Sequence, residues 1–257
     1  MGTYIPHTDD EVESMLAFLG LSSVGQLFDV VPEALRLQRG LELATGAGEP
    51  DVLAAMEGFG DLNRARSDRL VCFAGGGAYD HEIPSVTRAL AGRSEFVTSY
   101  TPYQPEVAQG VLQAIFEYQT MVARLAGLPV ANASLYDGGS AAVEGVNLGV
   151  AASGRQGVWV SGGVHPHWRQ MLATCAAGTG HQLHEIPLDH GRTVWPDGDT
   201  DPPGVLVVGY PNYLGCIEDL ARARALCDRS GALLVVGIDP VAAGILKSAG
   251  EWGADVV

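Results

Sequence analysis

Short, nearly continuous apolar runs constrain the fold of this 257-residue chain more than any other feature. They are bounded by glycine or proline and separated by helical patterns, and the clearest are VWVSGG (158–163), VLVVGYP (205–211) and LLVVGID (233–239). Strands that are apolar along their whole length are typical of parallel sheets that helices cover on both faces. We therefore predict an α/β domain with a mostly parallel sheet.

Two further runs lie at the ends of this pattern. LVCFAGGG (70–77) predicts a first strand, and ADVV (254–257) predicts the start of another, so we expect the complete protein to continue past residue 257. The part before these runs is helical in pattern. We expect an N-terminal helical arm or domain over 1–68 and an α/β large domain over 69–257 whose C-terminal part is missing.

The N-terminal arm carries local helix signals. Thr8 and Glu11 have the spacing of a capping box, and Gly20 suits the left-handed residue that ends a helix. A second, short helix is expected over about 22–32 and a third over about 50–65.

Charge and composition exclude several classes of function. A net charge of −15 disfavours nucleic acid and anionic membrane surfaces as partners, and no apolar run reaches transmembrane length. The first residues lack a signal-peptide pattern and the four cysteines form no C-x-x-C pair, so we expect reduced thiols in the cytoplasm. The G-x-S-x-G, Walker A and H-E-x-x-H motifs are absent, which argues against serine hydrolases, P-loop nucleotidases and zinc proteases.

GGGAYDHEIPSV (75–86) is the first segment that would carry chemistry. The dinucleotide-binding fingerprint fails here, because Asp80 stands where its last glycine would be. A flexible connection between a strand and a helix would explain the glycines alone. The grouping of Tyr79, Asp80 and His81 directly after them favours a functional loop.

SYTPYQPEVAQG (99–110) leads into a long amphipathic pattern that ends at Gly127. Pro105 and Glu106 are typical of the first two positions of a helix. We therefore predict that the helix starts at Pro105.

The residues just before Pro105 form a second candidate site. Thr101 and Gln104 precede prolines and are expected to be extended. With Tyr100 and Tyr103 they would present hydroxyl and amide groups beside the positive end of a helix dipole, which suits an anionic ligand. Two core tyrosines with hydrogen-bonded hydroxyls would explain the same pattern.

A third junction, over 137–142, has the composition of a phosphate cradle. Its glycines and Ser140 would offer backbone amides and a hydroxyl to a phosphate. Asp137 lies at the same helix entrance, where an N-cap carboxylate would accept those hydrogen bonds itself and repel a phosphate. The structural role of Asp137 is therefore favoured.

Two residues follow predicted strands at the edge where α/β proteins bind ligands. His165 would stack on a planar ligand there, and Asp239 would contact one, although Asp239 also suits an N-cap with Pro240 at the first helical position. His165, His167 and two later histidines would suggest a metal, but the spacing defines no fourth ligand. We expect no metal site.

Four segments together resemble a known family. These are YIPHTDDEVESML, GGGAYDHEIPSV, RSEFVTSYTPYQPEVAQGVLQAIFEYQTM and VANASLYDGGSAAVEG. They are similar to the α subunit (subunit 1) of the split glycine dehydrogenases (decarboxylating), the P-proteins of the glycine cleavage system. The likeness runs from the first residues to the end of the chain.

The resemblance implies a fold-type I pyridoxal-phosphate enzyme in which an α and a β subunit (subunit 2) pair and then dimerise as α2β2. It implies that the β subunit supplies the Schiff-base lysine and most contacts to pyridoxal 5′-phosphate, while the α subunit has lost cofactor binding and completes the active-site cleft. The implied reaction removes CO2 from glycine and passes the aminomethyl group to the lipoyl group of the H-protein.

The lysine content agrees with this division between subunits. A Schiff base with the cofactor needs a lysine amine, and Lys247 is the single lysine of the sequence. The family's lysine follows the cofactor-binding aspartate after a further strand, whereas Lys247 comes soon after Asp239. We therefore expect Lys247 on the surface and no catalytic residue in this chain.

The resemblance also assigns roles to the candidate residues. Ser140, His165 and Asp239 fall at cofactor positions and are expected to be vestigial. The residues expected to line the cleft come from the two loops described above: Gly76, Tyr79, His81, Tyr100, Thr101, Tyr103 and Gln104.

Two other functions stay open. The chain would also suit a non-catalytic subunit that stabilises the β chain or docks the lipoyl carrier. Alternatively, it is a paralogue that uses the same cleft on another amino acid in a biosynthetic pathway.

Overall fold

The structure is a computed structural model that describes residues 6–63, 71, 73, 75–77, 79–98, 100–196 and 202–257. Its contacts divide the chain into two units, Met1–Cys72 and Phe73–Val257, which are considered separately. The boundary expected at residues 68 and 69 lies outside the described residues, as does most of the strand expected over 70–77. The described residues of that run, 71, 73 and 75–77, are not in a strand.

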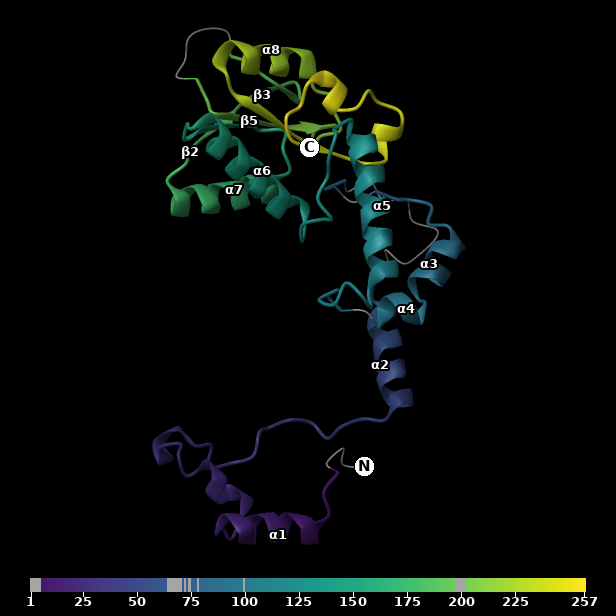
Figure 1. Cartoon of the computed structure of the whole chain (residues 1–257), viewed down its shortest axis with the longest axis vertical. Helices are drawn as coiled ribbons and strands as arrows, with labels where there is room; N and C mark the ends of the chain where they lie inside the picture. Colours follow the sequence, from purple (N-terminus) through teal and green to yellow (C-terminus); the bar gives the residue numbers. More distant parts are fainter. Residues whose placement is uncertain are drawn as a thin grey trace. The chain divides into compact units, whose positions relative to one another are not determined.

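The first unit is helical, as predicted. Its elements are α1 (Asp9–Leu19), η1 (Val24–Phe28), η2 (Glu33–Leu35) and α2 (Glu49–Asp61) (Figure 1). The capping box at α1 is confirmed, because Thr8 Oγ1 accepts from the N–H of Glu11 and the Glu11 carboxylate accepts from the N–H of Thr8. Gly20 adopts a φ of 70° and ends α1 as expected.

Two helices of the arm are shorter than predicted. The helix expected over 22–32 is only the 3₁₀ turn η1, which contains Gly25, a residue that disfavours a longer helix. α2 ends at Asp61 rather than near residue 65. Just after this end, the Asn63 side-chain amide donates to the Phe59 carbonyl, one of the last carbonyl groups of the helix. Among residues 6–63, none is buried.

The second unit begins with helices α3 (Ser85–Ala91), α4 (Ser94–Val97) and α5 (Gln109–Ala126). The predicted start of α5 at Pro105 is wrong. Pro105 begins an isolated turn in which the N–H of Ala108 bonds to the Gln104 carbonyl, and Ala108 itself is not helical (φ −110°, ψ 18°). The expected end of α5 at Gly127 is confirmed by its left-handed φ of 74°.

The predicted parallel sheet is confirmed. Its strands are β1 (Gly157–Ser161), β2 (Gln182–Ile186), β5 (Val205–Tyr210) and β6 (Leu233–Ile238), in the order β2-β1-β5-β6 with all neighbours parallel. Val256 pairs in parallel with Val235, so the ADVV run joins the sheet beside β6 as expected. A small hairpin, β3 (Leu188–Asp189) and β4 (Arg192–Thr193), lies between β2 and β5 in the sequence.

Helices cover both faces of the sheet, on opposite sides in Figure 1. α6 (Gly138–Ser153) and α7 (Pro166–Thr179) pack on one face, and α8 (Leu220–Ser230) packs on the other. β5 shows why its sequence is continuously apolar: Val205 and Val207 face the α6 side, whereas Leu206 and Val208 face α8. This sheet places the carboxyl ends of β1, β5 and β6 at one edge.

Candidate functional site

A cavity of about 260 Å³ opens at the carboxyl ends of β1, β5 and β6, where ligands bind in α/β proteins. We call it the sheet-edge cavity. The loop over 77–81, the start of α7 and the turns that follow the three strands line it. It brings together four of the predicted site residues from separate parts of the sequence, namely Tyr79, His81, His165 and Asp239.

Aromatic rings surround His165 in this cavity. Its imidazole is edge-on to the Tyr213 ring, with 4.9 Å between centroids, and lies 6.0 Å from the Trp168 ring. His165 Nδ1 accepts a hydrogen bond from the His167 N–H at 3.2 Å, so the proton of the neutral ring belongs on Nε2. Nε2 is therefore the N–H donor of the neutral His165 ring.

The glycine loop lies against this ring. A Cβ at Gly77 would be 3.2 Å from Cδ2 and 3.3 Å from Nε2 of His165, and one at Gly76 would be 3.6 Å from the Tyr213 hydroxyl. Both glycines have a positive φ, which favours glycine. The loop therefore packs against the side of the imidazole that carries Cδ2 and Nε2.

The helix entrance expected as a phosphate cradle is capped by its own aspartate. Asp137 Oδ1 accepts from the Ser140 N–H at 2.8 Å, and Oδ2 accepts from the Ser140 hydroxyl at 3.0 Å. These two hydrogen bonds, the backbone one first, lower the pKa of Asp137 below its ordinary value. The predicted N-cap role is confirmed, and the cap places a negative charge where a phosphate would bind.

Packing explains the two glycines of this entrance. A Cβ at Gly138 would lie 2.8 Å from Cε2 of Trp168, and one at Gly139 would lie 3.1 Å from Cε of Met171, with still closer approaches to other atoms of both side chains. Glycine at these positions therefore lets α7 approach the start of α6, and no ligand is needed to account for it.

The predicted N-cap role of Asp239 is wrong, because the N-cap of the element that follows is Val241. Asp239 Oδ1 accepts from the Val241 N–H at 2.9 Å, but only the 3₁₀ turn η4 (Ala242–Gly244) follows in place of the expected helix. The exposed Lys247 comes after this turn, and its Nζ lies 4.0 Å from the centroid of the Trp252 ring. The expectation that Lys247 lies on the surface is confirmed, and it does not line the sheet-edge cavity.

The second predicted loop lies apart from this cavity. Tyr100 and Thr101 line a separate hollow of about 430 Å³ beside α5, and neither Tyr103 nor Gln104 lines either cavity. Tyr100 is 93 % exposed and Tyr103 is 81 % exposed, so the alternative of two core tyrosines is wrong. The described residues of this chain bring the two predicted loops into no shared cavity.

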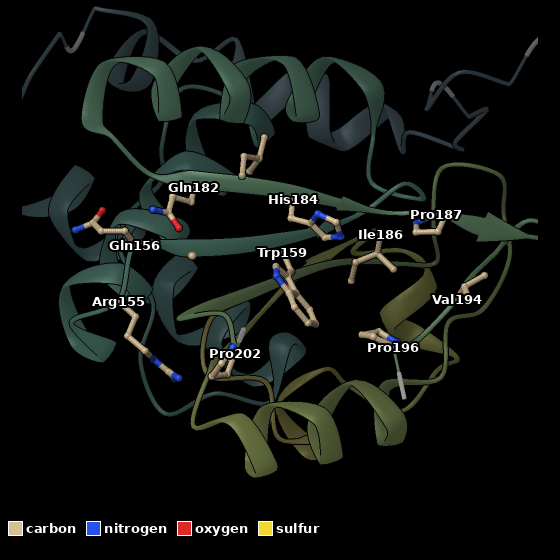
Figure 2. Close-up of a pocket in the computed structure, with 12 residues that line it drawn as sticks. Arg155, Gln156, Trp159, Gln182, His184, Ile186, Pro187, Val194, Pro196 and Pro202 are labelled. Atoms are coloured by element: carbon tan, nitrogen blue, oxygen red, sulfur yellow. The ribbon is translucent and has the colours of Figure 1, made fainter. Parts of the chain in front are cut away.

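A larger cavity, of about 750 Å³, contains none of the predicted site residues (Figure 2). Trp159 and His184 project into it from paired positions of β1 and β2. Its arginine is already engaged, because Arg155 Nη1 donates to the Ser230 carbonyl at 2.7 Å. Apolar side chains dominate the remaining lining, so no polar groups converge in it to define a site.

Sequence reasoning missed part of the sheet-edge cavity. Tyr213 and Trp168 form its aromatic walls, and neither was singled out. Trp168 lies in the first turn of α7, three residues after its N-cap His165, and this nearness in the sequence was the available signal. The signal at Tyr213 was its place directly after a predicted strand, in YPNYLG.

Two negative findings concern the described ranges alone. Within them, no helix is long and apolar enough to cross a membrane. The same residues contain no cluster of three or more histidine, cysteine or acidic side chains that would hold a metal ion.

The fold of this chain is also found in proteins of known structure. The structure resembles that of a Burkholderia pseudomallei sphingosine-1-phosphate lyase with a TM-score of 0.52 over 80 % of this chain and 51 % of that one, at 15 % identity, which shows a shared fold only. A second solved structure, glycine decarboxylase (P-protein) of the glycine cleavage system in an inhibitor-bound form, matches far more closely. It gives a TM-score of 0.86 at 44 % identity over 99 % of this chain and 57 % of that one.

Sequence comparison identifies the family. The family described as Glycine cleavage system P-protein matches residues 2–257. Probable glycine dehydrogenase (decarboxylating) subunit 1 of Desulforamulus reducens is 44 % identical, and that of Geotalea daltonii is 41 % identical, each over 99 % of this chain. The chain belongs to the glycine cleavage system P-protein family, as its motifs implied, and it has the expected fold-type I architecture. It spans 57 % of the length of these relatives.

Proposed function

We propose that this chain is the α subunit of a P-protein that acts only with a β subunit. The complex decarboxylates glycine and passes the aminomethyl group to the lipoyl group of the H-protein. We further propose that it assembles as α2β2 in the cytoplasm, and that the β subunit holds the pyridoxal 5′-phosphate. Membership of the P-protein family supports the reaction, and the names of the relatives as subunit 1 support a separate partner subunit.

The capped helix entrance carries the assignment of the cofactor to the partner. Asp137 accepts the hydrogen bonds that a phosphate would need, and its carboxylate would repel that phosphate. The single lysine lies away from the sheet-edge cavity, against Trp252. The residues of this chain therefore do not fit a covalently held pyridoxal phosphate, and Ser140, His165 and Asp239 are vestigial cofactor positions.

The exposed tyrosine loop is the proposed contribution of this chain to the cleft. Tyr100 and Tyr103 are too exposed to support the core of their own unit, and their phenol groups are free to line a partner's cleft. Because α5 begins at Gln109, the loop over 100–104 does not adjoin its N-terminus. We therefore assign contacts with an anionic group, the substrate carboxylate or the cofactor phosphate, to the side chains of Thr101 and Gln104 rather than to the helix dipole.

The chemistry of electron withdrawal belongs to the pyridoxal phosphate of the partner, which acts as an electron sink for decarboxylation. The residues of this chain bind and orient instead. Gly76, Tyr79 and His81 form the second wall of the cleft, and the two loops together restrict the orientation of the substrate carboxylate and exclude water. These are roles in which hydroxyl and amide side chains held by a rigid backbone suffice.

The test is reconstitution with a matched pair of tyrosine variants. The full-length subunit is co-expressed with its candidate β partner, and glycine–bicarbonate exchange is measured together with the absorbance of the bound cofactor. Tyr103→Phe removes a hydroxyl from the proposed cleft, whereas Tyr118→Phe removes one from α5, outside both loops.

We expect exchange to fall in Tyr103→Phe and to persist in Tyr118→Phe, with assembly intact in both. Unchanged turnover in Tyr103→Phe would favour the non-catalytic, stabilising subunit. Exchange with a different amino acid but not with glycine would favour the paralogue. A cofactor absorbance band from this chain alone would overturn the assignment of the cofactor to the partner.

A further inference from the structure

One hydrogen-bond network contains all four buried polar side chains of the described ranges. These are Ser161, Thr193, Asn212 and Glu218, each no more than 6 % exposed. They come from β1, from β4 and from the segment after β5, and one of them, Asn212, itself lines the sheet-edge cavity. Buried polar groups that are fully bonded hold their surroundings in one arrangement.

Glu218 is the acceptor at the end of this network. Its Oε1 accepts from the Thr193 hydroxyl at 2.8 Å and from the Asn212 side-chain amide at 2.7 Å. The Thr193 N–H lies 3.2 Å from Oε1 and 3.1 Å from Oε2 and donates to the carboxylate. These donors are all neutral groups, so several hydrogen bonds together compensate for burial of the carboxylate.

The carboxylate sets the direction of the hydroxyl chain. Because Thr193 Oγ1 donates its proton to Glu218, it accepts the proton of the Ser161 hydroxyl, 2.6 Å away. The Ser161 oxygen is then the acceptor for the Gly163 N–H at 3.0 Å. Each hydrogen bond of the series is therefore donated in the same direction, from the Gly163 N–H through the two hydroxyl groups to the Glu218 carboxylate.

The turns after β1 and β5, next to the aromatic rings of His165 and Tyr213, are both hydrogen-bonded to this network. The Gly163 carbonyl accepts from the Tyr213 N–H at 2.7 Å, which joins the turn after β1 to the turn after β5. Asn212 Oδ1 accepts from the N–H groups of Leu214 and Cys216, each at 3.0 Å, and holds the second turn closed. A Cβ at Gly163 would be 2.9 Å from the Cβ of Asn212, so the two turns are in direct contact.

The two turns end in the residues against which the glycine loop packs. His165 follows the first turn and Tyr213 lies in the second, with 4.9 Å between their ring centroids. Gly77 lies against His165, and Gly76 lies near the Tyr213 hydroxyl. A shift of either turn would therefore move the loop that carries Tyr79 and His81.

We propose that Glu218 is a positioning residue. Through Thr193, Ser161 and Asn212 it fixes the positions of the two turns against which the loop over 75–81 packs. It thereby fixes the side chains that this loop presents to the cleft. The network's effect on the two turns is independent of the proposed glycine chemistry, whereas its effect on turnover rests on that proposed function.

The test uses Thr193, because its two conservative variants separate the hydroxyl from the fold. Thr193→Val replaces the hydroxyl with a methyl group of similar size and leaves the Ser161 hydroxyl without its acceptor, whereas Thr193→Ser keeps the hydroxyl. Hydrogen exchange of backbone amides is measured in the assembled complex for both variants. Glu218→Met serves as a second disrupting variant, because it removes the oxygen that accepts from both the Thr193 hydroxyl and the Asn212 amide while keeping a side chain of similar length.

We expect Thr193→Val to raise exchange of the Gly163 and Tyr213 amides roughly tenfold, and Thr193→Ser to restore the wild-type rates. The amides of β5 serve as the internal control and should keep their protection. A merely structural role would instead raise exchange across β5 as well. Wild-type rates at both amides in Thr193→Val would overturn the proposal.

Turnover separates this proposal from the proposed function. If wild-type complex exchanges glycine and bicarbonate, Thr193→Val should lower kcat about tenfold, with a smaller change in KM, and Thr193→Ser should recover it. Local amide exchange without any loss of kcat would overturn the link to the cleft loop. If the wild-type complex is inactive on glycine but the local exchange effect is present, the proposed function fails while the seating of the turns by Glu218 is supported.

Discussion

The backbone of Gly77 lies directly against the imidazole of His165, and a Cβ at Gly77 would be 3.2 Å from its Cδ2 atom. This contact joins the glycine-rich loop to the turn after β1, two segments that are far apart in the sequence. The loop packs beside His165, one of the predicted vestigial cofactor positions. The loop and the turn after β1 both line the sheet-edge cavity.

Replacing Gly77 with alanine tests that contact. Gly77 has a φ of 82°, and alanine there meets both backbone strain of about 1–2 kcal/mol and the His165 ring. We expect the loop to leave its seat and glycine–bicarbonate exchange by the assembled complex to fall roughly tenfold or more.

Gly75→Ala is the matched control for this change. Gly75 also has a positive φ, of 65°, but no atom of the described residues lies within 4 Å of the added Cβ. It should carry similar strain without the collision, and its loss of turnover should be clearly smaller. Equal losses in the two variants would show that strain in the loop, and not contact with His165, decides the effect.

Strands β1, β5 and β6 and several helix ends were predictable because their signals are local or repeat along the chain, whereas β2 matched no predicted run. All six residues of β5 are buried, which agrees with the prediction that a continuously apolar run is a strand covered on both faces of the sheet. The end of α5 was predictable from Gly127 alone, because a glycine readily adopts the left-handed conformation that ends a helix. The start of α5 failed because the proline signal at Pro105 is satisfied by a single turn, and Ala108 then leaves the helical conformation.

The site was predictable in part, from topology and from the grouping of Tyr79 and His81 after a glycine run. His165 and Asp239 follow parallel strands, whose carboxyl ends meet at one edge, and so they share a cavity. The exposure of Tyr103 was not predictable from residue type, because tyrosine side chains are usually partly buried. Glu218 was missed for the opposite reason, since a glutamate is rarely buried unless several donors surround it, and those donors come from distant segments.

Asp137 gives a prediction for pH dependence. Its pKa is lowered in the folded chain by the backbone and hydroxyl hydrogen bonds of Ser140. The unfolded chain therefore binds more protons in the acidic range, and stability rises with pH there. The contribution of Asp137 is present above the unfolded pKa of about 3.9 and is lost as the pH falls through the lower, folded pKa.

Thermal unfolding of two Asp137 variants across the acidic range tests this. Asp137→Ala should lower Tm at neutral pH, and its difference from wild type should shrink as the pH falls. Asp137→Asn keeps a side chain that caps a helix without a charge, so it should retain most of the Tm and lose the pH-dependent part. A constant Tm difference between Asp137→Ala and wild type at every pH would contradict a charged cap.

The cysteines should differ sharply in reactivity. Cys227 is fully buried in the core between α8 and the sheet, and burial raises the pKa of its thiol to about 12. Its reactive thiolate is then almost absent at neutral pH. Alkylation of the native chain followed by mass spectrometry should label Cys175 and Cys216, which are partly exposed, and spare Cys227 until the chain unfolds. Labelling of native Cys227 at the rate of Cys175 would contradict the packing of α8.

Two helical glycines should respond to alanine in opposite directions. Gly149 on α6 faces the sheet, and a Cβ there would lie 2.6 Å from a methyl group of the fully buried Val205. Overpacking of this kind costs about 1–3 kcal/mol, which exceeds the gain of about 1 kcal/mol from replacing glycine in a helix. On α7, Gly178 has no neighbour within 4 Å of the added Cβ, so only the gain applies. Urea unfolding should therefore show a lower midpoint for Gly149→Ala and a higher one for Gly178→Ala, and stabilisation by both would mean that α6 can move away from β5 at little cost.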